Sequence, residues 1–70
     1  MDREPVRSSN IQSVGYDAST STLEVEFHGG SIYRYFGVPE PTHQALMAAT
    51  SKGAYLNKNI KNRYRFEQLK

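Results

Sequence analysis

The chain has no cysteine and no tryptophan among its 70 residues. Without cysteine, no disulfide can brace the fold, and no thiolate can bind a metal or attack a substrate. The two histidines, His28 and His43, are far apart in the sequence and would have to recruit carboxylates to hold a zinc ion. We therefore expect no metal site and no cofactor.

Long apolar runs are also missing. No stretch approaches the roughly 20 apolar residues that span a membrane, and no apolar segment of the kind found in a secretory signal follows the charged N-terminus. We expect a soluble, cytoplasmic protein without membrane contact. A chain of this length buries only roughly 60% of the surface that it exposes when unfolded. The sequence therefore predicts one domain with a thin core, and it leaves the oligomeric state open.

The signatures of common enzyme classes are absent. No serine lies in a Gly-x-Ser-x-Gly turn, and no glycine-rich phosphate loop precedes Lys and Ser or Thr. Glu24 and Glu26 are expected on one solvated strand face, although a catalytic pair needs a desolvated carboxyl group. His28 and His43 are expected to be exposed polar residues. The sequence predicts a protein that is not an enzyme.

Positive charge gathers in the C-terminal part of the chain. Residues 51–70 hold six cations and one acid, a net of +5, whereas residues 1–50 hold three cations and six acids, a net of −3. Aromatic residues are interleaved with these cations. Cations neutralise phosphates, and rings stack on unpaired bases. The candidate nucleic-acid-binding residues are Tyr33, Arg34, Tyr35, Lys52, Tyr55, Lys58, Lys61, Arg63, Tyr64 and Arg65. The alternative is a solvated charged surface with tyrosines that pad the core.

Three segments have strand character. Residues 22–27 alternate between apolar and acidic residues, which is the period of a strand with one wet face. Residues 31–36 are rich in aromatic and β-branched side chains, and Gly29-Gly30 between the two segments predicts a hairpin turn. Residues 13–17 are expected to form a third strand. The result is a three-stranded antiparallel meander.

The register of the hairpin has two alternatives. A two-residue loop pairs Phe27 with Ile32 and turns Arg34 toward the core. A three-residue loop pairs Phe27 with Ser31 and turns Tyr33 and Tyr35 there instead, because one residue of slip exchanges the two faces of a strand. An arginine fits a thin core badly, which favours the second register.

Two short helices are expected after the meander. The first should run from about Pro39 to Ala49, since proline is tolerated in a first helical turn, and Ser51 can cap the second. Residues 64–67 alternate ring and charge, so a short C-terminal strand is plausible. We expect an α+β domain over residues 9–70, preceded by a flexible tail at residues 1–8.

An ordered set of motifs resembles the KTSC domain family, which is named for a C-terminal extension of lysyl-tRNA synthetases. The matching segments are Ser9-Asn10-Ile11, Val14-Gly15-Tyr16-Asp17, Leu23-x-Val25-x-Phe27, Gly30-x-x-Tyr33-x-Tyr35, Val38-Pro39, Ser51-x-Gly53-x-Tyr55-x-Asn57-x-x-Ile60 and Tyr64. The match covers residues 9–70 and includes the Tyr-x-Tyr hallmark of the family. Leu56 stands where an aromatic ring is expected.

The resemblance implies a small stand-alone module related to the synthetase extension. The function of the family is not established, and RNA binding, including binding of tRNA, is the usual suggestion. A protein-interaction module without nucleic-acid binding is the rival hypothesis, with the acidic strand face or a sheet edge as the docking surface. The sequence leaves open whether the ligand is RNA, DNA or a protein.

Overall fold

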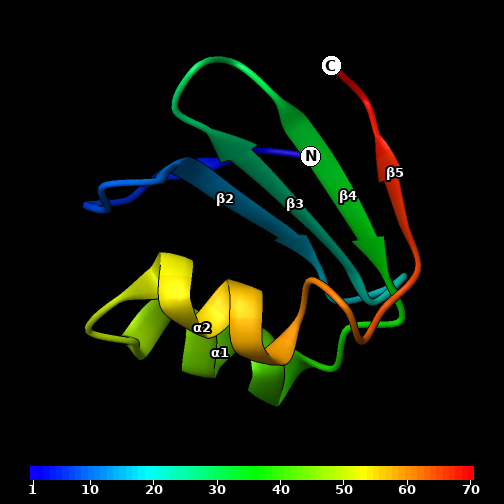
Figure 1. Ribbon diagram of the computed structural model, residues 1–70. Coiled ribbons are helices and arrows are strands. Elements are labelled where there is room, and N and C mark those ends of the chain that lie inside the picture. The colour runs from blue at the N-terminus through cyan, green and yellow to red at the C-terminus, as the bar shows by residue number, and fades with distance from the viewer.

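In a computed structural model, which describes residues 1–70, the chain forms a five-stranded antiparallel sheet with two helices on one face (Figure 1). The strands lie in sequence order, β1-β2-β3-β4-β5. Their bounds, with those of the helices, are β1 Glu4–Pro5, β2 Ile11–Asp17, β3 Thr22–Phe27, β4 Ile32–Phe36, α1 Glu40–Ala48, α2 Lys52–Asn59 and β5 Phe66–Gln68. The predicted α+β class and the two helices are confirmed.

The predicted three-stranded sheet is too small. β5 pairs with β4, and β1 pairs with β2 within residues 1–8, where a flexible tail was expected. These two edge strands have three and two residues. The alternation of ring and charge over residues 64–67 predicts a strand where β5 begins, whereas β1 is too short to display a period-two pattern and is recognisable only by its pairing with β2.

The β3–β4 hairpin adopts the second of the two registers. The N–H of Phe27 donates to the carbonyl of Ser31 at 2.8 Å, so the loop consists of residues 28–30. Gly29 and Gly30 have φ angles of 104° and 98°, which favour glycine. Val25 therefore lies opposite Tyr33, and the two β4 tyrosines lie on the face that packs against the helices. Arg34 lies on the other face.

Each helix starts as its first residues predict. α1 follows Pro39 and has Pro41 in its first turn. α2 is capped by Ser51, whose hydroxyl accepts a hydrogen bond from the N–H of Ala54 at 3.3 Å. Neither helix is long and apolar enough to cross a membrane.

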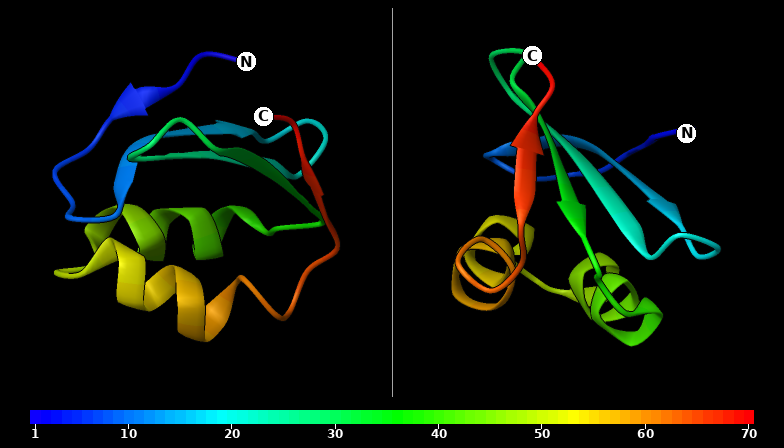
Figure 2. Two further views of the ribbon diagram at one scale, coloured as in Figure 1. Left: turned by 45° about the horizontal axis from the view of Figure 1, so that its top comes forward. Right: turned by 90° about the vertical axis from the view of Figure 1, so that its right-hand side faces the viewer.

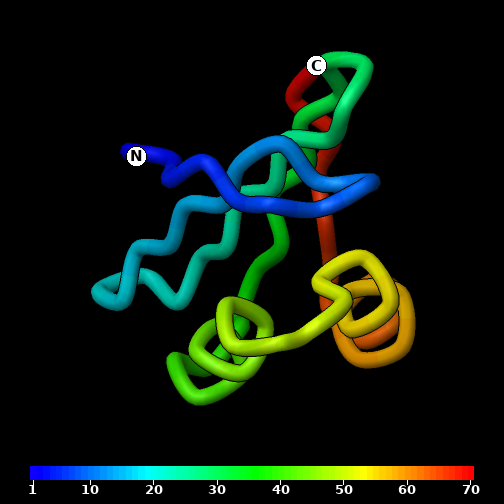
Figure 3. Tube along the Cα trace, turned by 90° about the vertical axis from the view of Figure 1, so that its left-hand side faces the viewer, coloured from blue at the N-terminus to red at the C-terminus, as the bar shows by residue number.

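One small core joins the helices to the sheet. Leu46 of α1 and Leu56 of α2 pack against residues from three strands and the segment after β4. The core residues are Ile11, Val14, Leu23, Val25, Tyr35, Val38, Leu46, Leu56 and Ile60. The helices lie side by side under the sheet, and the N-terminal segment crosses its opposite face (Figures 2 and 3). We call the face away from the helices the outer face.

Candidate functional site

A shallow pocket lies on the helix side of the sheet, near the hairpin end of β3 and β4. It has a volume of about 250 Å³ and is lined by Phe27, Ser31, Tyr33, Tyr35 and Lys61. The turn of the hairpin lies at the end of the sheet that points away from the helices (Figure 1). Lys61 comes from the turn that follows α2. We refer to these five residues as the aromatic pocket.

The aromatic rings of the pocket are fixed against one another. Phe27 and Tyr33 meet edge to face, with centroids 5.6 Å apart and an interplanar angle of 88°. The Tyr33 and Tyr35 rings are nearly parallel, at 6.4 Å. Phe66 of β5 packs against both tyrosines, at 5.6 and 6.0 Å. Such contacts between rings hold these side chains in place, so the pocket exists without a ligand.

Tyr35 forms the buried floor of the pocket, with 1% of its surface exposed. Burial, and next the neighbouring Tyr33, raise the pKa of its hydroxyl above the usual value, so that it is a neutral group. This hydroxyl forms no hydrogen bond within the protein. The hydroxyl of Tyr33 donates to Gln68 Oε1 at 3.3 Å, and that of Tyr16 donates to the carbonyl of Val38 at 2.6 Å.

Three exposed cations lie at the C-terminal end of α2, namely Lys58, Lys61 and Arg63. The carbonyl of Leu56 accepts hydrogen bonds from the N–H groups of Ile60 and Lys61, at 3.0 and 2.8 Å. This tight turn ends the helix and fixes the backbone of Lys61 beside the pocket. We call Lys58, Lys61 and Arg63 the α2-end cations.

The other predicted cations do not join this group. Arg34 binds Glu24 on the outer face, and Arg65 lies over the Phe36 ring at 5.7 Å. The ammonium group of Lys52, at the far end of α2, donates to the carbonyl of Ala49 at 3.2 Å. The basic C-terminal segment of the sequence is therefore not one continuous basic surface.

The four predicted tyrosines do not form one exposed aromatic surface. Tyr33 is half-buried and lines the pocket, whereas Tyr35 belongs to the core. A base therefore cannot stack on the face of the Tyr35 ring unless the core opens, and this part of the prediction needs correction. Tyr55 and Tyr64 are half-buried and pack against the core. The structure thus brings together three predicted residues in one pocket: Tyr33, Tyr35 and Lys61.

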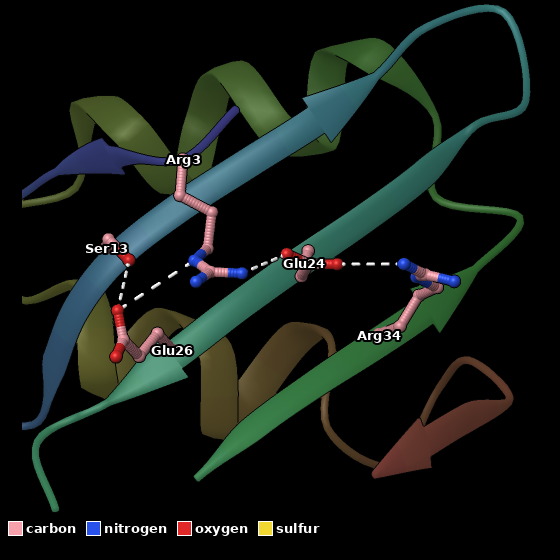
Figure 4. Close-up of polar contacts among 5 residues, drawn as sticks. All are labelled: Arg3, Ser13, Glu24, Glu26 and Arg34. Carbon is pink, nitrogen blue, oxygen red and sulfur yellow. Dashed lines mark hydrogen bonds and ion pairs between the residues drawn. The ribbon is translucent and has the colours of Figure 1, made fainter. Parts of the chain in front are cut away.

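The acidic face predicted for β3 is not solvated at Glu24. That residue is 4% exposed, and its carboxylate binds Arg3 from the N-terminal segment and Arg34 from β4, the latter at 3.0 Å (Figure 4). Burial alone would raise the pKa of Glu24, but the hydrogen bonds from Arg34 and Arg3 outweigh it and lower that pKa. Because two arginines already balance the charge of Glu24, this carboxylate is not available to bind a basic partner. Of the acidic surface expected on β3, only Glu26 remains accessible to a partner.

Glu26 lies at the edge of the same network. Its Oε1 atom accepts a hydrogen bond from the hydroxyl of Ser13 at 2.9 Å and lies 3.8 Å from Nε of Arg3 (Figure 4). Arg3 therefore bridges both acids of β3. Sequence reasoning missed this role of Arg3, because the residue was assigned to a flexible tail.

The histidines differ from each other. His28 is exposed as expected, with Nε2 at 2.8 Å from the carbonyl of Ser8. His43 is half-buried, and its ring stacks on Tyr16 at 4.5 Å with an interplanar angle of 8°. Burial lowers the pKa of His43, against the opposing effects of Glu40 and Glu4. No three His, Asp or Glu side chains converge in a way that could hold a metal ion.

Comparison with known proteins now decides the family. The sequence model of the KTSC domain matches residues 7–64. The chain belongs to the KTSC domain family. Its fold closely matches the crystal structure of a KTSC domain protein from Yersinia pestis, with a TM-score of 0.92, 41% identity, and coverage of 99% of this chain and 97% of that one. The resemblance drawn from the motifs is confirmed.

Two kinds of relative share the KTSC domain with this chain. An uncharacterised protein of Stutzerimonas stutzeri is 43% identical over 70 residues, which is 99% of each chain. A lysine–tRNA ligase of Nostoc punctiforme is 46% identical over 61 residues, which is 87% of this chain. The match spans only 11% of that ligase. The similarity therefore concerns a small part of the synthetase.

Proposed function

We propose that this KTSC domain is a non-enzymatic, cytoplasmic module that binds single-stranded segments of RNA through the aromatic pocket and the α2-end cations. The observation that carries the proposal is the position of Lys61. This residue lines the aromatic pocket and also belongs to the group of exposed cations that includes Lys58 and Arg63. A group for phosphate and rings for a base are therefore available at one place.

Charge and chemistry both favour a nucleic acid at this place. Non-specific binding of single strands combines cations that contact the backbone with aromatic rings that contact the bases. The α2-end cations have no acidic partner, since every ion pair of the protein involves Arg3 or Arg34. Their charges are therefore free to neutralise phosphates.

We propose RNA and not DNA as the ligand because some relatives of this chain are tRNA ligases. The lysine–tRNA ligases, as their name states, act on tRNA, and three of them carry a segment that is 44–46% identical to this chain. Unpaired regions of RNA offer bases that proteins reach far more easily than bases within an A-form helix. We propose loops or single-stranded ends of tRNA, or of similar RNAs, as the natural ligands.

A charge-reversal experiment tests the proposal. The Lys58→Glu/Lys61→Glu variant should bind a single-stranded RNA about tenfold or more weakly, because the phosphate contacts dominate affinity. Arg7→Glu/Lys52→Glu is the matched control, with the same change in net charge at the other end of α2. It should lose much less affinity, because screening limits exposed charges to about 10 Å at 0.1 M salt. Equal losses in the two variants would contradict the proposed site.

A protein-interaction role is the second candidate, and the edge of the sheet favours it. β5 is the last strand, and its outer side has no partner strand. Phe66 and Leu69, in and beside it, are 52% and 42% exposed. An open edge can recruit an extended peptide. Co-purification of a protein that is abolished by Leu69→Lys but unaffected by Lys58→Glu would favour this role over RNA binding.

A further inference from the structure

We infer that the aromatic pocket receives a single unpaired nucleobase, with the hydroxyl of Tyr35 bound to the edge of the base and Lys61 bound to its phosphate. This inference rests on the proposed function and deepens it. RNA binding could occur through phosphate contacts alone. The pocket adds a specific position for one base, and this position distinguishes unpaired from paired nucleotides.

The unpartnered hydroxyl of Tyr35 carries the inference. Tyr35 is 1% exposed and lines the pocket, yet its hydroxyl has no hydrogen-bond partner in the protein. The buried side-chain atoms that lack a partner are Nε of Arg3 and Nε of Arg34, so the Tyr35 hydroxyl is not sealed in the core but open to the pocket. A polar group on a ligand in the pocket can therefore bind it, whereas phenylalanine would offer no such contact.

The other tyrosines on this side of the sheet show how such hydroxyls are normally satisfied. Tyr16 donates to a backbone carbonyl, and Tyr33 donates to the side chain of Gln68. At the floor of the pocket, the hydroxyl of Tyr35 has no such partner. Because a phenol both donates and accepts, it can pair with an amino, carbonyl or ring-nitrogen group on a base.

The walls of the pocket suit a planar ligand. The rings of Phe27 and Tyr33 stand at 88° to one another. A planar base that stacks on the face of one ring therefore meets the other ring edge to face. Stacked and edge-to-face contacts are the two favoured arrangements of aromatic pairs. Stacking of this kind tolerates any base, so we expect little discrimination by the walls themselves.

The size and the rim of the pocket limit the ligand further. Its volume of about 250 Å³ lies below the roughly 300–1,000 Å³ of pockets for drug-sized ligands, which suits a ligand as small as one base. Ser31 and Lys61 supply the polar rim, and Lys61 places a positive charge where a phosphate follows the base. A base within a duplex is excluded, because its edge is already paired and its faces are stacked.

A matched pair of single-atom variants tests the inference. Tyr35→Phe removes only the free hydroxyl, and Tyr16→Phe, outside the pocket, removes one that is already bonded within the protein. Fluorescence anisotropy should measure binding of two probes, a single-stranded RNA ten-mer and a perfectly paired RNA duplex. We expect Tyr35→Phe to weaken binding of the ten-mer about three- to tenfold, the usual effect of one lost hydrogen bond. Tyr16→Phe should change it less than about twofold.

Two measurements separate the base pocket from RNA binding in general: the affinity for the duplex, and the dependence of the affinity on salt concentration. Tyr35→Phe should leave both the affinity for the duplex and the salt dependence unchanged, since no phosphate contact is lost. Unchanged binding of the ten-mer by Tyr35→Phe would overturn the base pocket and leave RNA binding standing. Equal weakening for the ten-mer and the duplex would also overturn it. A wild-type protein that binds neither probe at low salt would overturn both proposals.

NMR spectroscopy gives a second measurement, which detects binding at the pocket itself. Addition of uridine or adenosine 5′-monophosphate should shift the backbone amide NMR signals of Ser31 and Lys61 in the wild-type protein, and these shifts should weaken in Tyr35→Phe. The thermal stability of Tyr35→Phe should stay close to that of the wild type, because the variant removes no hydrogen bond within the protein. Nucleotide shifts that occur only away from the hairpin would contradict the pocket.

Discussion

The guanidinium group of Arg3 reaches across β2 to bind the carboxylate of Glu24 on β3, twenty-one residues further along the chain (Figure 4). Arg34 binds the same carboxylate from the opposite side. Glu24 is thus held between the N-terminal segment, which lies beyond β2, and the neighbouring strand β4. This ion pair fastens the N-terminal segment to the outer face of the sheet.

Arg3→Gln should lower the free energy of unfolding by about 1–3 kcal/mol, because it removes a hydrogen bond to a charged and buried carboxylate. Arg7→Gln is the control, since Arg7 is exposed and has no ion pair. Urea unfolding of both variants measures the difference. Equal stability of the two variants would show that Arg3 does not hold Glu24 in solution.

Gly15→Ala should destabilise the protein through the N-terminal segment. A Cβ atom at residue 15 would lie 2.8 Å from the carbonyl oxygen of Asp2 and 3.1 Å from Cγ of Arg3, which is too close. The segment must shift, so we expect a loss of about 1–2 kcal/mol, mostly the contact of Arg3 with Glu24. The same substitution in a protein that lacks residues 1–5 should be neutral or slightly stabilising, because alanine restricts the unfolded chain. A loss of equal size in the shortened protein would contradict this explanation.

The stability of the protein should fall in acid partly because of Glu24. The pKa of this carboxyl is lower in the folded than in the unfolded state, so its contribution is complete above the unfolded value of about 4.3. It is lost as the pH falls through the folded pKa, because the unfolded state then binds the proton more readily. Glu24→Gln should therefore be less stable than the wild type near pH 7 and flatten the acid limb of the stability curve. Parallel curves from pH 7 to pH 2 would contradict the assignment.

Ser51→Ala should cost about 1 kcal/mol, because the hydroxyl of Ser51 caps α2 through the N–H of Ala54. Ser51→Asn should restore most of the stability, since asparagine caps equally well. Thr50→Ala, at the neighbouring exposed position, is the control. Thermal unfolding measures all three, and an identical effect of Ser51→Ala and Ser51→Asn would show that the cap does not matter.

Patterns within one element made most of the fold predictable. The alternation of residues 22–27, the two glycines of the hairpin and the cap at Ser51 each act locally, and the structure confirms all three. The poor fit of Arg34 to a core also indicated the correct register of β4. The family was predictable for a related reason, because its motifs lie in one fixed order along the chain.

The missing parts depend on contacts between distant segments. β1 has too few residues for a periodic pattern, and Arg3 meets Glu24 only after the sheet has formed. The one local signal was Gly15, since a glycine inside a strand often marks the close approach of another backbone. Charge density along the sequence also misled, because it does not show where each side chain lies in the fold. Arg65 lies over the Phe36 ring, whereas Lys61 lines the aromatic pocket.

The most direct test of the account is the affinity of the wild-type protein for a single-stranded RNA ten-mer, measured from low to physiological salt. Three phosphate contacts by Lys58, Lys61 and Arg63 predict a slope of about −2 for log K against log salt concentration. The Lys58→Glu/Lys61→Glu variant should have a slope close to zero or no measurable binding. An absence of wild-type binding at low salt, or an equal slope in the variant, would contradict the RNA-binding role of this domain.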